Sequence, residues 1–336
     1  MLVLRNICLI VAALLAAGSI SFAEENVSDS GSSAPAAPDR IQVKMLVFWN
    51  DIDMDISTDG LRNDVQYMPN DATILGVGLS YNGLGLKLTH ASGSGDRDQR
   101  VYGTTEVRDY RMYYYSAALC VDLMYQRYKG YYLDDPDDFG YAAGDPPTIR
   151  GDLDMRNVAF NLYYVVSERL SLPAAFEQTD IQRECGGSFI LMMTLQQNDI
   201  SSDGSLFPPS VASQVGMEYR GGRYQHALAG AGYGYGFVLR HFFFTPMLMA
   251  CLGMTRARDD RGADSPVHYD MSYKLIMKFA LGYNGDTFYW GVINMMDGLG
   301  YNAKRTDAGS PDDERTIDVN VFAHYVELFF GMKFDI

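Results

Sequence analysis

The stretch YDMSYKLIMKFALGY, which runs from Tyr269 to Tyr283, decides the fold. Its odd-numbered residues are all apolar or aromatic, whereas its even-numbered residues are mostly polar or small. Successive side chains of an extended chain point to opposite faces, so this alternation predicts a β-strand. Strands of globular proteins usually have about five or six residues, and this one is long enough to cross a bilayer at a tilt of roughly 45°. We therefore expect one strand of a transmembrane β-barrel.

The same alternation recurs along most of the chain, between turns and polar loops. Asn82-Gly83 separates two alternating runs, and an Asn-Gly pair in that position is a strong signal for a β-hairpin. A soluble β-sandwich would have a polar outer face, whereas here the apolar face recurs from strand to strand. The sequence predicts an all-β fold, a transmembrane antiparallel β-barrel of about 12–14 strands. The expected strands cover residues 41–50, a hairpin at 72–90, 107–116, 119–128, 153–165, 170–178, 187–197, 224–239, 242–254, 269–283, 287–296, and a final hairpin of 316–322 with 326–336.

The N-terminal region has the features of an export signal. Residues 1–23 hold one early charge at Arg5, an apolar run and a small-x-small site that ends at Ala23. This pattern predicts a signal peptide that is cleaved after Ala23, because the apolar run falls short of the about 20 residues that a spanning helix needs. Residues 24–40 are rich in Ser, Pro and Ala and predict a disordered lead. The barrel domain is then expected over residues 41–336, in the cell outer membrane.

The composition and the C-terminal stretch indicate which partners to expect. The 24 Tyr, 17 Phe and 33 Gly suit strands with aromatic girdles. A formal net charge of -15 argues against nucleic acid as a partner. Residues 326–336 alternate like the other strands, and an apolar final strand is typical of proteins that the outer-membrane assembly machinery inserts. We expect that machinery, outer-membrane lipid and lipopolysaccharide as partners.

Four segments are distinctive enough to compare with a known family. They are LGVGLSYNGLGLKL at residues 75–88, DLMYQRYKGYYL at 122–133, NLYYVVSERLSLPAAFEQTDIQRECGGSF at 161–189 and ALGYNGDTFYWGV at 280–292. These segments resemble a bacterial outer-membrane β-barrel family of unknown function, whose members are secreted proteins of about this length. The resemblance covers most of the mature chain and implies the barrel architecture. It implies no catalytic or ligand residues.

Enzyme motifs do not stand out in the chain. The histidines are His90, His226, His241, His268 and His324, and no GxSxG serine-hydrolase motif occurs. His268 and Ser272 could share an inward strand face, but a catalytic pair also needs hydrogen-bond reach and an orienting third group. We expect no catalytic residues. A lipid-modifying enzyme, an acyl hydrolase or acyltransferase, is kept as the alternative function.

Two further motifs resemble ligand-binding loops, but the residues around them do not fit. The glycines of AGAGYGYGF, residues 229–237, fall on one strand face with no helix after them, so they do not form a dinucleotide-binding loop. Asp51, Asp53 and Asp55 begin like a calcium loop, but Ile56 occupies the position that needs glycine. The sequence therefore predicts neither a cofactor nor a specific metal site.

Polar residues on the face opposite the apolar one are the remaining candidates for a functional site. Mixed charge inside a barrel can line a narrow aqueous path, or it can form ion pairs that fill the lumen. We expect either a narrow passive pore or a structural and surface-binding barrel, and the sequence leaves these two open. The possible lumen-facing residues are Asp122, Gln126, Asp154, Arg156, Glu177, Asp270, Lys274 and Lys278.

Overall fold

The computed structural model describes one folded unit. The chain divides into residues 1–38 and 39–336, and the described residues are 40–59, 61, 63–70, 73–91, 98–145, 148–215, 218–259, 267–306 and 314–335. The expected signal peptide and almost all of the expected lead lie outside them. No helix in this described part is long and apolar enough to cross a membrane.

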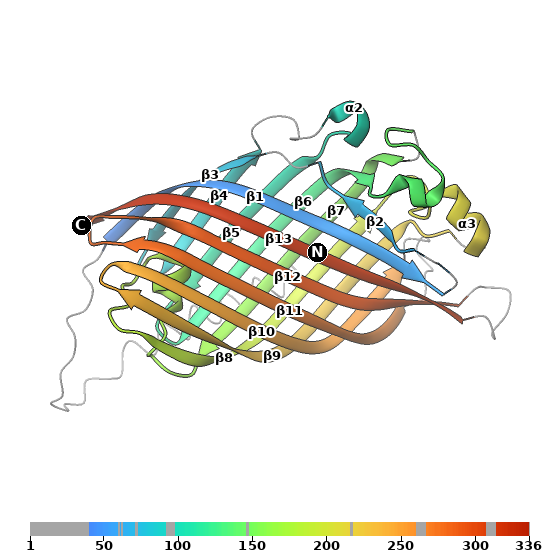
Figure 1. Cartoon of the computed structure of the whole chain (residues 1–336). Coiled ribbons are helices and arrows are strands. Elements are labelled where there is room, and N and C mark those ends of the chain that lie inside the picture. Colours follow the sequence, from blue (N-terminus) through green and yellow to red (C-terminus); the bar gives the residue numbers. More distant parts are fainter. Residues whose placement is uncertain are drawn as a thin grey trace. The chain divides into compact units, whose positions relative to one another are not determined.

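The described strands form one antiparallel sheet of 13 strands that closes on itself (Figure 1). All strands but the short β2 form the ring, in chain order, and β13 pairs with β1 from Asp335 beside Arg40 to Ile317 beside Thr58. β2 fills a gap between β1 and β6. The strands are β1 (Arg40–Thr58), β2 (Val65–Met68), β3 (Ile74–Tyr81), β4 (Leu84–Ala91), β5 (Glu106–Tyr115), β6 (Leu119–Leu133), β7 (Ile149–Val165), β8 (Gly186–Ser201), β9 (Gly221–Leu239), β10 (Phe242–Asp259), β11 (Val267–Asn284), β12 (Phe288–Thr306) and β13 (Glu314–Asp335).

The two ends of the barrel differ in their connections. One end, which we call the terminal rim, holds Arg40, Asp335 and most of the tight turns (Figure 1). At the Asn82-Gly83 turn the φ angles are 48° and 79°, as an Asn-Gly hairpin requires. The opposite end, the loop rim, carries most of the longer loops and, among the described residues, three short helices, namely α2 (Gln99–Tyr102), η1 (Pro136–Phe139) and α3 (Pro209–Val215).

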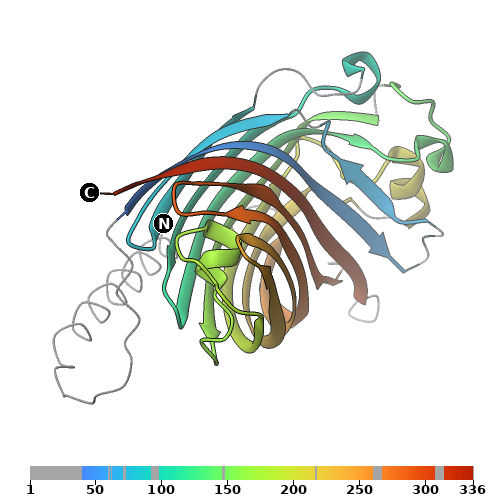
Figure 2. The ribbon, with the colours of Figure 1, turned by 60° about the vertical axis from the view of Figure 1, so that its left-hand side comes forward.

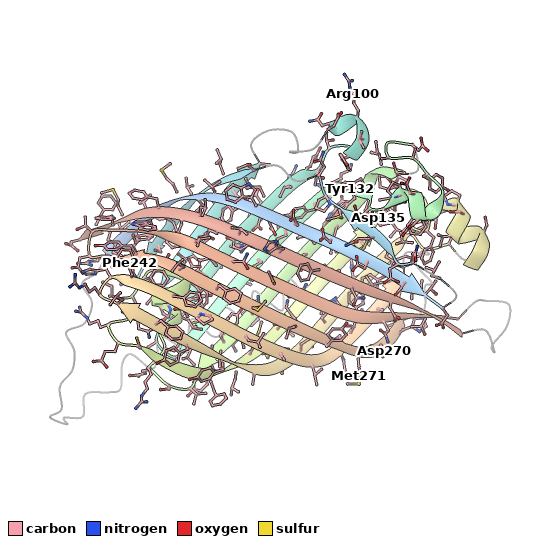
Figure 3. The ribbon with its side chains drawn as sticks, viewed as in Figure 1. Arg100, Tyr132, Asp135, Phe242, Asp270 and Met271 are labelled. Carbon is pink, nitrogen blue, oxygen red and sulfur yellow. The ribbon has the colours of Figure 1, made fainter. Side chains whose placement is uncertain are left out.

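The apolar face of the strands points outward. On β11 Tyr269 is 63% exposed and Met271 is 68% exposed, whereas Lys274 is 2% exposed. Figure 3 shows Met271 on the outside of the barrel. Trp49 and Trp290 also lie on this outer face. An apolar exterior with a polar interior is the reverse of a soluble protein and is typical of a barrel in lipid.

Two expected elements are wrong. Residues 170–178 form no strand: they lie in the connection between β7 and β8 and contain the π-helix Pro173–Glu177. Their apolar alternation resembled a strand, but Pro173 cannot donate to a ladder and side chains of both parities are buried. The expected final hairpin is instead one continuous strand, β13. The polar His324 lies between the two apolar runs, but the chain stays extended there and His324 pairs with Asp51 of β1. With these two changes, the first strand begins and the last strand ends at the same rim of the barrel.

The outward apolar face gives a test of the fold. Leu275 lies near the middle of β11 and is 51% exposed, so Leu275→Arg should lower the free energy of unfolding in lipid vesicles by about 2–4 kcal/mol. Leu275→Ala is the control, and it should cost much less because no charge enters the lipid. Urea unfolding followed by tryptophan fluorescence measures both. Equal effects of the two variants would contradict a lipid-facing position.

Candidate functional site

The connection between β7 and β8 folds into the lumen at the terminal rim. We call residues 166–185 the inner segment, and Figure 2 shows it in yellow-green at the mouth of the barrel. All five residues of its π-helix are buried. Gln42 of β1 donates a hydrogen bond to the Gln178 carbonyl at 3.0 Å, and Asn284 of β11 donates to the Asp180 carbonyl at 2.8 Å. Two strands that are separated in the ring by β13 and β12 thus hold the inner segment in place.

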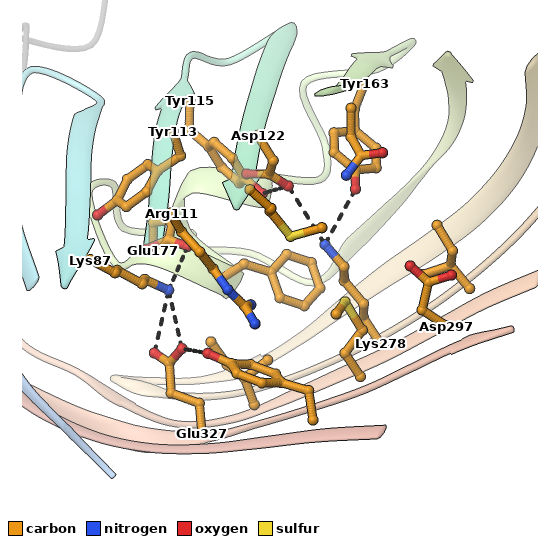
Figure 4. A pocket seen from close by; sticks show the side chains of 17 residues that line it. Lys87, Arg111, Tyr113, Tyr115, Asp122, Tyr163, Glu177, Lys278, Asp297 and Glu327 are labelled. Atoms are coloured by element: carbon orange, nitrogen blue, oxygen red, sulfur yellow. Dashed lines mark hydrogen bonds and ion pairs between the residues drawn. The ribbon is translucent and has the colours of Figure 1, made fainter. Parts of the chain in front are cut away.

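Glu177 of the inner segment is the centre of an ion-pair network. Its two carboxylate oxygens each lie 2.9 Å from an ammonium group, those of Lys44 on β1 and Lys87 on β4. Figure 4 shows the pair with Lys87. Lys87 also pairs with Glu327 of β13 at 3.1 Å, and the Tyr325 hydroxyl donates a hydrogen bond to Glu327. Burial alone raises the pKa of Glu177, but the two lysines outweigh it and hold this pKa below its usual value. Glu177 is therefore a carboxylate at neutral pH.

An arginine and a third carboxylate continue the network away from the inner segment. Arg111 binds Asp109 through two hydrogen bonds of 2.9 Å, and its guanidinium lies 4.1 Å from the centre of the Tyr325 ring. Asp109 also accepts hydrogen bonds from Asn50 and Gln126. The fork of Arg111 matches the carboxylate, and the remaining lone pairs of Asp109 are satisfied by amides. Buried charge of this kind is stable only when it is paired and hydrogen-bonded in this way.

Two lysines of β11 form separate pairs. Lys278 lies 3.9 Å from Asp122 and 3.5 Å from the Tyr163 hydroxyl. Lys274 lies 2.9 Å from Asp297 of the neighbouring strand. Lys278 thus has a carboxylate partner across the interior and Lys274 has one on the next strand, so the charge along β11 is neutralised locally.

A small cavity lies within the network. It measures about 50 Å³ and is lined by charged groups that include Lys87, Glu177 and Lys278 (Figure 4). A water molecule needs roughly 10–15 Å³ of such volume, so the cavity has room for a few waters. The side chains and the inner segment fill this part of the lumen.

The structure separates the expected lumen-facing residues into two groups. Asp122, Gln126, Glu177, Lys274 and Lys278 lie in the barrel interior, and Asp270 shares the inward face of β11 but is only half-buried. Asp154 and Arg156 do not share that face. They lie on the outer face of β7, beside Arg127 of β6, which pairs with Asp154. The expectation that Asp154 and Arg156 face the lumen is therefore wrong, since the inward face of β7 holds the odd-numbered residues.

Sequence reasoning missed five members of the network, namely Lys44, Lys87, Asp109, Arg111 and Glu327. The signal was present for several of them. Lys44 lies opposite the apolar face of β1, and Lys87 lies between Leu86 and Leu88. The alternation that singled out Lys274 and Lys278 would have identified both.

The arrangement offers little for catalysis among the described residues. His268 and Ser272 lie four positions apart on one strand, a separation of roughly 13 Å that is beyond hydrogen-bond reach. His226 contacts the Thr255 hydroxyl at 2.7 Å, and His324 contacts Asn294 at 2.8 Å on the outer face. No group of three potential metal ligands occurs in the described part of the chain.

The family follows from comparison of the whole sequence. Residues 37–316 match a family described as a domain of unknown function, DUF4421. The chain belongs to this family. None of the curated proteins matches the chain. The DUF4421 chain also resembles solved barrels, at a level that assigns no function.

Three of these solved structures illustrate the level of similarity. The outer membrane protease OmpT from Escherichia coli has 8% identity and a TM-score of 0.37, and the match covers 92% of this chain and 99% of that one. The Pseudomonas putida toluene transporter TodX has 9% identity and a TM-score of 0.29, with 90% of each chain covered. OmpT of Vibrio cholerae has 8% identity and a TM-score of 0.28, with 88% of this chain and 99% of that chain covered.

The position of Glu177 between two buried lysines predicts a large effect of neutralising it. Glu177→Gln leaves the Lys44 ammonium without a carboxylate and leaves Lys87 with Glu327 alone, and breaking a buried pair typically costs about 3–5 kcal/mol of unfolding free energy. Glu168→Gln, at an exposed position in the same inner segment, should have almost no effect. Chemical unfolding of both variants in vesicles measures the difference. A Glu177→Gln variant as stable as the parent would show that the ion pairs do not hold the inner segment.

Proposed function

We propose that this protein is an outer-membrane β-barrel with the terminal rim in the periplasm and the loop rim facing outward. The exposed apolar face of strands such as β11 supports the membrane location. Outer-membrane barrels have short periplasmic turns and longer outer loops, and this rule supports the orientation. A signal peptide ending at Ala23 would supply the export route.

We further propose that the barrel is closed in its resting state and serves as a structural and surface-binding barrel. The observation that carries this proposal is Glu177, which is buried in the lumen and bridges Lys44 and Lys87 from different strands. An open diffusion pore needs a continuous aqueous path, whereas here the inner segment and the ion pairs occupy the lumen near the terminal rim. The loop rim then offers the surface on which binding takes place.

A second candidate is a pore that opens when the inner segment moves. The inner segment is held partly by ion pairs and hydrogen bonds, namely those of Gln42, Lys44, Lys87 and Asn284. When the inner segment leaves, water can replace these charged and hydrogen-bonded contacts. Water could not replace contacts between tightly packed apolar side chains without a loss of free energy. The lipid-modifying alternative has less support, because the described histidines lack an evident serine partner.

Single-channel recording in a planar bilayer tests the closed state. The parent protein, shown to be folded, should give a silent bilayer, and a variant in which residues 172–180 are replaced by a short Gly-Ser linker should be compared beside it. A silent linker variant would indicate that side chains of the wall also fill the lumen. Discrete steps from the linker variant alone would favour the second candidate.

Conductance steps from the parent protein would contradict the closed resting state. In that outcome the Lys274→Ala, Lys278→Ala double variant shows whether these lysines line the path, since removing two positive charges should shift ion selectivity towards cations. The recordings therefore distinguish a closed barrel, a displaceable inner segment and an open pore.

A further inference from the structure

A row of arginines crosses several strands on the outer face of the barrel. The strand register places them side by side, because Arg108 pairs with Arg127 and Arg127 pairs with Arg156. Asp199 of β8 interrupts the row, and Arg223 and Arg258 continue it on β9 and β10. We call this set the arginine row: Arg108, Arg127, Arg156, Arg223 and Arg258.

The arginine row lies just beyond the apolar surface, on the side of the loop rim. Tyr110 is the next outward residue after Arg108 on β5, and Tyr125 is the next after Arg127 on β6. The two tyrosine rings stack with their centres 6.1 Å apart. Aromatic rings are enriched where the hydrocarbon region meets the headgroups, so the arginines next to them are at headgroup level.

The acidic residues nearby do not neutralise the arginine row. Asp154 pairs with Arg127 and Arg156, and Asp199 pairs with Arg223 at 2.6 Å. Arg108 makes no ion pair among the described residues, and the side chains of Arg156 and Arg223 remain 49% and 57% exposed. An excess of positive charge remains on this face, although the whole chain carries a formal charge of -15.

Adjacent like charges are unfavourable in the protein alone. Neighbouring strands lie roughly 4.8 Å apart, and like charges directly opposite each other destabilise a sheet. Arg108, Arg127 and Arg156 occupy three adjacent strands in one register row, with Asp154 beside two of them. A multivalent anion that bridges the guanidinium groups would relieve this repulsion.

We propose that the arginine row binds the phosphate groups of a phosphorylated lipid headgroup in the outer leaflet, as found in lipopolysaccharide. This inference rests on the membrane location and orientation proposed above. The guanidinium fork is suited to phosphate through paired hydrogen bonds. The neighbouring Tyr110 and Tyr125 lie at the edge of the apolar surface, so a lipid can place its acyl chains against the barrel and its phosphates against the arginines. Charge complementarity and this position select a lipid over a soluble anionic partner.

Titration of the detergent-folded protein with lipid A, followed by native mass spectrometry, tests the proposal. The parent should bind bisphosphorylated lipid A more tightly than its dephosphorylated form, and binding should weaken as ionic strength rises. Arg108→Gln with Arg156→Gln removes two exposed charges and leaves Arg127 paired with Asp154. This double variant should bind lipid A about 25-fold more weakly, at about 5-fold for each arginine.

A matched control separates local binding from net charge. Arg169→Gln with Arg183→Gln also removes two exposed arginines, but from the inner segment at the opposite rim, and it should bind lipid A like the parent. Equal affinity of the Arg108, Arg156 variant and the parent would overturn the proposal. Equal loss in both double variants would also overturn it, because the effect would then follow net charge alone.

Two further measurements identify the source of the anion. Inorganic phosphate or polyglutamate that binds the arginine row as tightly as lipid A would overturn the assignment to a lipid. Insertion into vesicles is measured in parallel by protection from protease. Insertion without any preference for phosphorylated lipid would overturn the role of the arginine row and leave the membrane location in place, whereas failure of the folded protein to insert would contradict the location itself.

Discussion

The closure of the sheet by β1 and β13 is the constraint on which the rest of the structure depends. Inside a bilayer no water is available to the backbone, so every amide and carbonyl group needs a partner within the protein. The pairing of β1 with β13 runs along the whole of β1, from Arg40 to Thr58, and it leaves no open edge at that junction. A closed sheet of this kind can therefore turn its apolar side chains to lipid without leaving backbone groups unpaired at an edge.

Closure also determines what the interior must contain. With the apolar face turned to lipid, the polar face of each strand points into a confined lumen. Lys44, Lys87 and Glu327 come from three different strands, and the inner segment brings Glu177 among them. Desolvation of such groups is costly unless each meets an opposite charge. The inner segment therefore fills the lumen and also supplies the carboxylate that pairs with Lys44 and Lys87.

The outer face shows a second arrangement of charge. Arg108, Arg127 and Arg156 come together through the register of β5, β6 and β7, next to the tyrosines at the edge of the apolar surface. Inside the barrel the cations are matched by carboxylates, whereas along the arginine row they outnumber them. The charge balance of the two regions differs because a buried lysine needs a carboxylate partner within the protein, whereas a surface arginine can bind an anion from its surroundings.

The sequence by itself determined the strands, their hairpins and most of their faces. Period-two alternation is a local property, and it placed Lys274 and Lys278 in the interior because each strand's apolar face is continuous. Only the tertiary structure decided which groups meet. The alternation of residues 170–178 resembled a strand, yet the segment turns into the lumen, and its Glu177 meets lysines far away in sequence. Asp154 and Arg156 were placed on the wrong face because Leu153 and Met155 make the odd-numbered face apolar where β7 begins, whereas the folded sheet buries that face and turns the even-numbered residues outward. Side-chain partners across a barrel depend on the register between strands, which local periodicity does not encode.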